Sequence, residues 1–97
     1  MNKINTVQVI VSEDMSNYIE GLMYEVNARK DLVAFCIERG MSLDGEIFQR
    51  YHKEYVDFSA QYEMAKKELE KTYVQAEYPN SKWRLDFPTH TLTIEVA

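Results

Sequence analysis

Cysteine, glycine and proline are scarce in this chain of 97 residues: one Cys, three Gly and two Pro. The single cysteine, Cys36, allows no intramolecular disulfide, so nothing in the sequence points to an oxidising compartment. The isolated glycines at positions 21, 40 and 45 form neither a P-loop nor a dinucleotide-binding fingerprint. We therefore expect no cofactor bound by a glycine-rich loop.

Long apolar runs are also missing. No stretch approaches the ~20 apolar residues that a membrane-spanning helix needs. The opening residues, MNKINTVQVIVSEDM, carry one Lys, a short apolar run and no small-residue cleavage site, which is not the pattern of a signal peptide. We expect a cytoplasmic protein that does not contact a membrane.

Basic residues are in the minority, with 11 Lys and Arg against 16 Asp and Glu and a net charge of −5. Residues 1–47 hold four basic and eight acidic side chains, so most of the negative charge lies in the N-terminal half. An acidic surface repels nucleic-acid phosphates and anionic lipids, which argues against both as partners. A partner selected by charge is expected to be basic.

Motifs that would name a reaction are absent. Cys36 lies on an apolar helical stripe, where a small buried hydrophobe is expected rather than a nucleophile. Neither His52 nor His90 has a Cys, His or Glu partner at the spacing of metal ligands. We predict His52 at a core edge or surface and His90 in a turn, and we predict no catalytic residue, metal ligand or cofactor.

Both ends of the chain alternate between apolar and polar residues, which is typical of strands. Residues 4–11, INTVQVIV, place valines on one face and Gln8 and Ile10 on the other. Residues 83–87 and 91–96 alternate in the same way around a short turn containing PTH. The pattern predicts one strand near the start of the chain and a hairpin near its end.

The residues between these strands have a helical period. Residues 14–39 follow a predicted N-cap, Ser12, and stop at Gly40. Arg29 interrupts the apolar stripe of this helix, and the sequence leaves open whether the helix is kinked or broken within residues 27–31. The stripe consists of Met15, Ile19, Leu22, Val26, Val33 and Cys36, widened by Tyr18, Met23, Leu32 and Phe35.

A second helix is predicted within residues 43–75, with Ser42 as its cap. Its apolar residues are spaced alternately by three and four over three heptads, which is the a/d pattern of a helix-pairing seam. Phe58, in the middle of this seam, is expected to be buried between the helices. The seam consists of Phe48, Tyr51, Tyr55, Phe58, Tyr62, Ala65 and Leu69.

Because an isolated β-hairpin is marginal in water, the C-terminal pair of strands needs a third strand and a helical surface to pack on. The chain supplies both. We therefore predict a single α+β domain over residues 1–97, in which a helical hairpin of two long helices packs on a small antiparallel sheet in the order β-α-α-β-β.

The helix containing FQRYHKEYVDFSAQYEMAKKELEKTY is followed by a Pro-containing turn and the pattern W-x-x-D-F-x-x-x-x-L-x-I. Over residues 43–97 this arrangement resembles the small accessory proteins of the "CXXX repeat peptide modification system" family, most specifically at Trp83, Asp86, Phe87 and Ile94. The resemblance implies a non-catalytic accessory or carrier role in making a modified peptide, and it implies no catalytic residue. The chain lacks the repeated Cys-x-x-x pattern of a substrate peptide.

An open sheet also suggests how such a protein would bind. Three strands leave two edges, and an edge strand is a template for another chain. We predict that a protein or peptide partner, or a second copy, pairs along residues 4–11, with dimerisation through the aromatic helix as the competing mode. The alternative function is an acidic, phage-type anti-defence inhibitor that blocks a basic protein site, and a small enzyme is the third possibility. The candidate binding residues are Gln8, Val9, Ile10, Arg84, Thr91 and Thr93.

Overall fold

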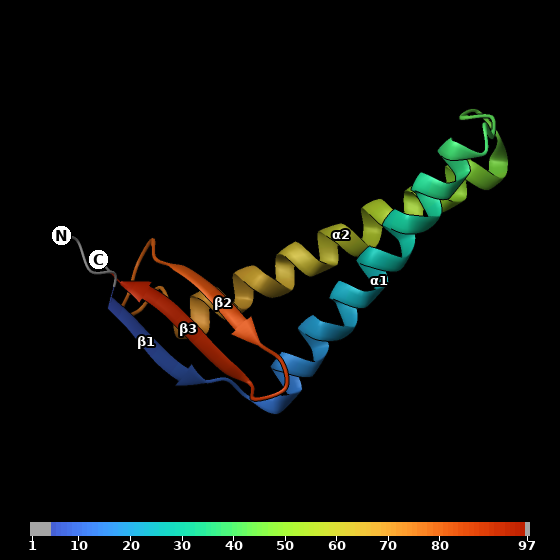
Figure 1. Cartoon of the computed structure of the whole chain (residues 1–97). Helices are drawn as coiled ribbons and strands as arrows, with labels where there is room; N and C mark the ends of the chain where they lie inside the picture. The colour runs from blue at the N-terminus through green and yellow to red at the C-terminus, as the bar shows by residue number, and fades with distance from the viewer. Residues whose placement is uncertain (1–4, 97) are drawn as a thin grey trace. The chain divides into compact units, whose positions relative to one another are not determined.

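A computed structural model describes residues 5–96. The order β-α-α-β-β is confirmed, and the fold is α+β with a three-stranded antiparallel sheet (Figure 1). The first strand was predicted from residue 4, and Ile4 lies outside the described residues. The elements are β1 (Asn5–Ile10), α1 (Glu13–Glu38), α2 (Glu46–Tyr73), β2 (Lys82–Asp86) and β3 (Thr91–Val96).

The chain divides into two compact units, and one of them is built from two segments that are far apart in the sequence. Unit 1 joins the residues up to Glu20 with those from Ala65 onward, so it contains the sheet, the start of α1 and the end of α2. Unit 2 is Gly21–Met64, the remainder of the helical hairpin. Each helix has residues in both units.

The sheet of unit 1 has the strand order β1-β3-β2, with both neighbours antiparallel to β3. The register aligns Val7, Ile94 and Trp83 across the three strands, and one step further it aligns Val9, Leu92 and Leu85. Side chains alternate between faces along a strand, so these rows form one apolar face. On the central strand Leu92 and Ile94 are fully buried.

Both helices contribute to the cover of this apolar face. Ile19 of α1 and Leu69 of α2 are among the most buried side chains of the chain. The indole Nε1 of Trp83 donates to Glu70 Oε1 at 2.8 Å, and the backbone N–H of Ser12 donates to the Tyr73 hydroxyl at 3.2 Å. The end of α2 is therefore tied to the hairpin on one side and to the start of α1 on the other.

The two predicted ends of α1 are confirmed. Ser12 caps the helix, because its Oγ accepts the N–H of Met15 at 3.2 Å. At the other end Gly40 has a positive φ of 70°. The N–H groups of Gly40 and Met41 donate to the carbonyls of Ile37 and Cys36, both at 3.0 Å, which is a Schellman motif.

The predicted cap of α2 is wrong. Ser42 lies in a turn in which its carbonyl accepts the N–H of Gly45, and the helix begins at Glu46. The carbonyl of Gly45 accepts the N–H of Gln49, so the glycine occupies the N-cap position. Gln49 Nε2 also donates to the Leu43 carbonyl at 2.6 Å, and this contact holds the turn against the first turn of the helix.

Helix α1 is not broken near Arg29, because it is continuous through residues 27–31. That segment contains no Gly or Pro, and Arg29 is bonded within its own helix to Glu25. The predicted apolar stripe is narrower than expected. Tyr18 and Phe35 are 59% and 49% exposed, and the guanidinium of Arg39 lies over the Phe35 ring.

The a/d seam of α2 is confirmed as its less exposed side, but the aromatic part is only half-buried. Phe48, Ala65 and Leu69 are buried, whereas the residues between Phe48 and Ala65 on the seam have intermediate exposure. Phe58 was predicted to be buried, and it is only half-buried. The guanidinium of Arg29 lies over the Phe58 ring, 4.7 Å from its centroid. The Arg29 side chain is partly exposed to water, so this face of the ring is not sealed from solvent.

These burial differences predict unequal effects of truncation on stability. Leu69→Ala should lower the free energy of unfolding by about 2–5 kcal/mol, because Leu69 is fully buried in unit 1. Phe58→Ala should cost less than the ~3–5 kcal/mol of a fully buried phenylalanine. Met64→Ala is the matched control on the same helix, since Met64 is 71% exposed, and should change stability by no more than about 0.5 kcal/mol.

Urea unfolding of the three variants measures these differences. A larger loss for Phe58→Ala than for Leu69→Ala would contradict the interpretation that the sheet-facing part of α2, and not its aromatic part, anchors the core.

Candidate functional site

Among residues 5–96, no strand pairs with the outer side of β1. Val11 N–H donates to the His90 carbonyl at 2.8 Å, immediately beyond the last registered pair of β1 and β3. Backbone groups alternate in direction along an antiparallel ladder, so Val7 and Val9 also point their N–H and C=O groups toward β3. The backbone groups of Thr6, Gln8 and Ile10 point outward, where no described strand pairs with them.

The opposite edge of the sheet is formed by β2, and it differs in charge. Its exposed side chains are Lys82, Arg84 and Asp86, so every second residue carries a charge. Charged side chains on an edge strand discourage pairing with another chain. β1 has no ionisable residue between Asn5 and Ile10. The edge of β1 is therefore the less protected of the two.

Side chains next to the β1 edge offer a partner two different surfaces. On the helix-covered side, Val7 and Val9 are only half-buried, because no described strand lies beyond them. On the other side Gln8 is exposed, and Ile10 is 70% exposed. An added strand would thus meet apolar side chains on one face and mixed side chains on the other.

The open face of the sheet brings together five of the six predicted binding residues. Gln8 pairs with Thr93, which pairs with Arg84, so these side chains form one row across the three strands. Ile10 and Thr91 stand in the next row, which ends at Asp86. Val9 is the exception, because its side chain lies on the apolar face.

The loop between β2 and β3 is fixed by local hydrogen bonds. Asp86 Oδ2 accepts both the N–H and the hydroxyl of Thr89, and the N–H of His90 donates to the Phe87 carbonyl at 3.3 Å. His90 has a positive φ of 53°, which closes the loop. The histidine is in a turn, as predicted.

His90 also makes a contact that sequence reasoning missed. Its Nδ1 lies 2.9 Å from the hydroxyl of Ser16, which is fully buried in the first turns of α1. A buried hydroxyl cannot reach a substrate, and the carboxylate of Asp86 is engaged by Thr89, so this pair does not resemble a working nucleophile and base. The signal was present, because Ser16 precedes Ile19 by three residues and thus lies on the apolar stripe.

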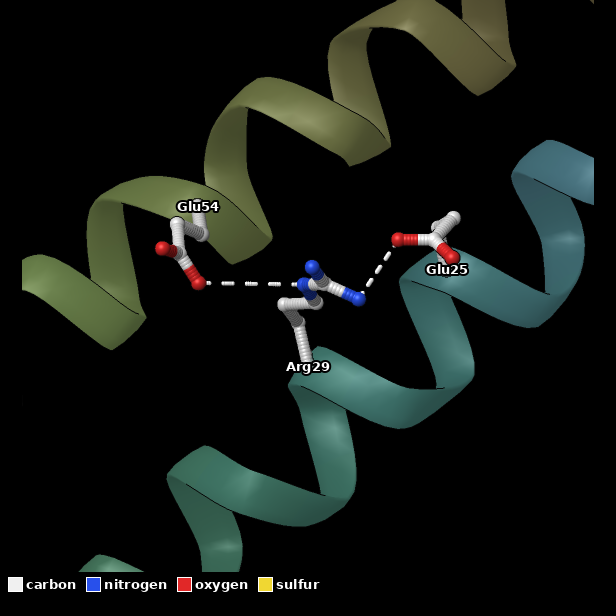
Figure 2. Close-up of polar contacts among 3 residues, drawn as sticks. All are labelled: Glu25, Arg29 and Glu54. Atoms are coloured by element: carbon white, nitrogen blue, oxygen red, sulfur yellow. Dashed lines mark ion pairs between the residues drawn. The ribbon is translucent and has the colours of Figure 1, made fainter.

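The main charged cluster of unit 2 surrounds Arg29 (Figure 2). Its Nη1 lies 2.5 Å from Glu25 Oε2 on the same helix, and its Nε lies 3.7 Å from Glu54 Oε2 on α2. With Phe58 beneath the guanidinium, the arginine links both helices. All these contacts lie within unit 2, and those with Glu54 and Phe58 join α1 to α2.

Three further observations concern residues 5–96. No three His, Cys, Asp or Glu side chains lie where they would share a metal ion. Cys36 is a free and buried thiol, and His52 is exposed with its ring stacked near Phe48 at 6.0 Å between centroids. Neither α1 nor α2 has a segment apolar enough and long enough to span a membrane.

No protein family, curated protein or solved structure shows significant similarity to this chain.

The Arg29 cluster yields a test of what joins the two helices. Arg29→Lys keeps the charge but loses the planar group that stacks on Phe58, and should lower the free energy of unfolding by about 0.5–1 kcal/mol. In a Phe58→Leu background the same change should cost less. A double-mutant cycle by urea unfolding measures the difference, and a coupling of zero would show that the stacking contributes nothing.

The Trp83–Glu70 contact can be followed directly, since Trp83 is the one tryptophan of the chain. Glu70→Gln keeps an acceptor and should leave the fluorescence maximum of Trp83 nearly unchanged. Glu70→Ala removes the acceptor from a partly buried indole, and should cost about 1–2 kcal/mol of stability and shift the emission to longer wavelength. Equal spectra for the two variants would contradict the bond.

Proposed function

We propose that this protein is a non-catalytic binding protein whose β1 edge takes up an extended segment of a protein or peptide partner. The observation that carries the proposal is the edge itself: the outward backbone groups of Thr6, Gln8 and Ile10 lack a partner among the described strands, and no charge protects them. Adding a strand to a sheet edge is an established mode of peptide recognition.

The alternation along β1 defines the chemistry of the partner. Main-chain hydrogen bonds to Gln8 and its outward neighbours provide affinity without regard to sequence. Specificity comes from side chains, since every second residue of the bound segment lies beside Val7 and Val9 on the apolar face. The preferred ligand is an extended segment with apolar residues at alternate positions and no proline at the paired ones.

The six predicted binding residues would not contribute equally. An added strand lies about 4.8 Å from β1 and roughly twice that distance from β3. Gln8, Val9 and Ile10 would therefore contact it directly. Arg84, Thr91 and Thr93 would be reached by a partner that also covers the open face of the sheet.

The resemblance to accessory proteins of peptide maturation suggests one setting for this activity. A strand edge suits an extended ligand, and a short peptide that has not folded would be one. We place the protein in the cytoplasm, where a single buried thiol such as Cys36 needs no partner.

The acidic inhibitor is the less favoured alternative. Within unit 2, eight acidic side chains are interspersed with five basic ones along the sequence. Glu25 and Glu54 are already engaged by Arg29. Imitation of nucleic acid needs closely spaced, unpaired negative charge. These features favour the strand acceptor.

A proline at Gln8 tests the proposed function. The N–H of Gln8 points outward, so Gln8→Pro should leave the sheet intact and change the free energy of unfolding by no more than about 1 kcal/mol. It should abolish binding of extended peptides selected from a random displayed library on the wild-type protein. Isothermal titration with the selected peptides gives the comparison, and Gln8→Thr, which keeps the N–H, is the control that should still bind.

Val9→Pro is the complementary variant, because the N–H of Val9 points toward β3 opposite Leu92. It should destabilise the fold by about 1–3 kcal/mol by leaving a buried acceptor unpaired. If selected peptides bind Gln8→Pro as tightly as the wild type, or if neither a peptide nor a second copy of the chain binds at this edge, the strand-acceptor function is wrong.

A further inference from the structure

β1 is complementary to itself. Its sequence, NTVQVI, contains no ionisable side chain, so two copies placed antiparallel set no like charges opposite one another. The same pairing at β2 is unfavourable. The backbone groups of β2 that point outward belong to Trp83 and Leu85. In the antiparallel register in which both residues pair, Arg84 would lie opposite Arg84 of the second copy.

The outward groups of β1 also fix a register. Hydrogen-bonded pairs form between residues whose backbone groups point outward, which are Thr6, Gln8 and Ile10. When the pairing is centred on Gln8, all three residues of each copy have a partner. Gln8 then faces Gln8 of the second copy, and Thr6 faces Ile10 of the second copy on both sides of the centre. A shift by two residues leaves one outward residue unpaired at each end.

The apolar face supports the same register. Val7 falls opposite Val9 of the second copy in non-hydrogen-bonded pairs, where side chains approach most closely. Both valines are half-buried in the single chain and would become covered. A twofold axis perpendicular to the sheet places the apolar faces of both copies on one side of a continuous sheet.

We infer that the segment taken up by the β1 edge is β1 of a second copy, so that two chains pair antiparallel about Gln8 and form one six-stranded sheet. This inference rests on the proposed function of the edge and names its partner.

A competing surface lies at the turn of the helical hairpin. Phe35, Ile37, Leu43 and Ile47 are each about half exposed, with fractions between 49% and 56%. Nothing in the structure shows what covers them. Dimerisation through the helices is therefore an outcome of the test and not the proposal.

Sedimentation equilibrium of the full chain is the first measurement. The wild type and Gln8→Thr should dimerise, and Gln8→Pro should weaken dimerisation at least about tenfold, because both bonds of the central pair are lost. A fold check by circular dichroism accompanies each variant. A monomeric wild type, or a dimer unaffected by Gln8→Pro, overturns the inference.

Charge exchange at the centre tests the register. Gln8→Lys or Gln8→Glu alone should weaken the dimer about two- to fivefold at low salt, and a mixture of the two should restore it as a heterodimer visible by native mass spectrometry. Thr6→Lys is the matched control, because the lysine introduced there would face Ile10 of the second copy and not another lysine. Equal effects of Thr6→Lys and Gln8→Lys overturn the register.

The outcomes separate the two proposals. If the chain is monomeric but selected peptides bind the wild type and not Gln8→Pro, the inference fails and the proposed function stands. If neither peptides nor a second copy pair at β1, both fail.

Discussion

Every strand pairing in this sheet includes β3. It lies between β1 and β2, and two residues of its apolar face, Leu92 and Ile94, are fully buried. The rest of unit 1 follows from this position. β1 and β2 become edges, their valines and aromatic residues stay half-buried, and the ends of both helices must cover the face on which Leu92 and Ile94 lie. The proposed function depends on the same arrangement, because a central β3 leaves β1 with a free side.

The two units differ in the kinds of side chain that they bury. In unit 1 the most buried apolar side chains are branched ones, such as Val11, Ile19 and Val74. Unit 2 pairs half-buried aromatic rings with charged groups, as Arg29 does over Phe58. A polar group on a helix-pairing face restricts the register and orientation of the helices at some cost in stability. Where the apolar stripe of α1 is interrupted, Arg29 contacts α2 through Glu54 and Phe58.

Much of the fold could be predicted from periodicity, since alternation at residues 4–11 and the spacing around Phe58 report the local structure directly. Ser12 and Gly40 were predictable because their roles depend on near neighbours. The errors came from contacts that a periodic pattern does not encode. The ion pair of Arg29 with Glu54 forms only when the two helices pair. Ser42 does not cap α2, because it lies in a turn that Gln49 stabilises through the Leu43 carbonyl. For the candidate site, the exposed faces were predictable, but the strand order and the direction of each N–H required the structure.

Unit 2 is inserted between the two halves of unit 1, and this has a consequence for folding. The pairing of Asn5 with Val96 joins residues from opposite ends of the described chain, so it has a high contact order. Closing a long flexible loop costs entropy before any pairing compensates for it. A helical hairpin formed from local contacts returns Ala65 toward Glu20 and shortens the effective loop. We therefore expect early pairing of the helices to speed formation of the sheet, so that a change that slows helix pairing also delays the pairing of β3 with β1 and β2.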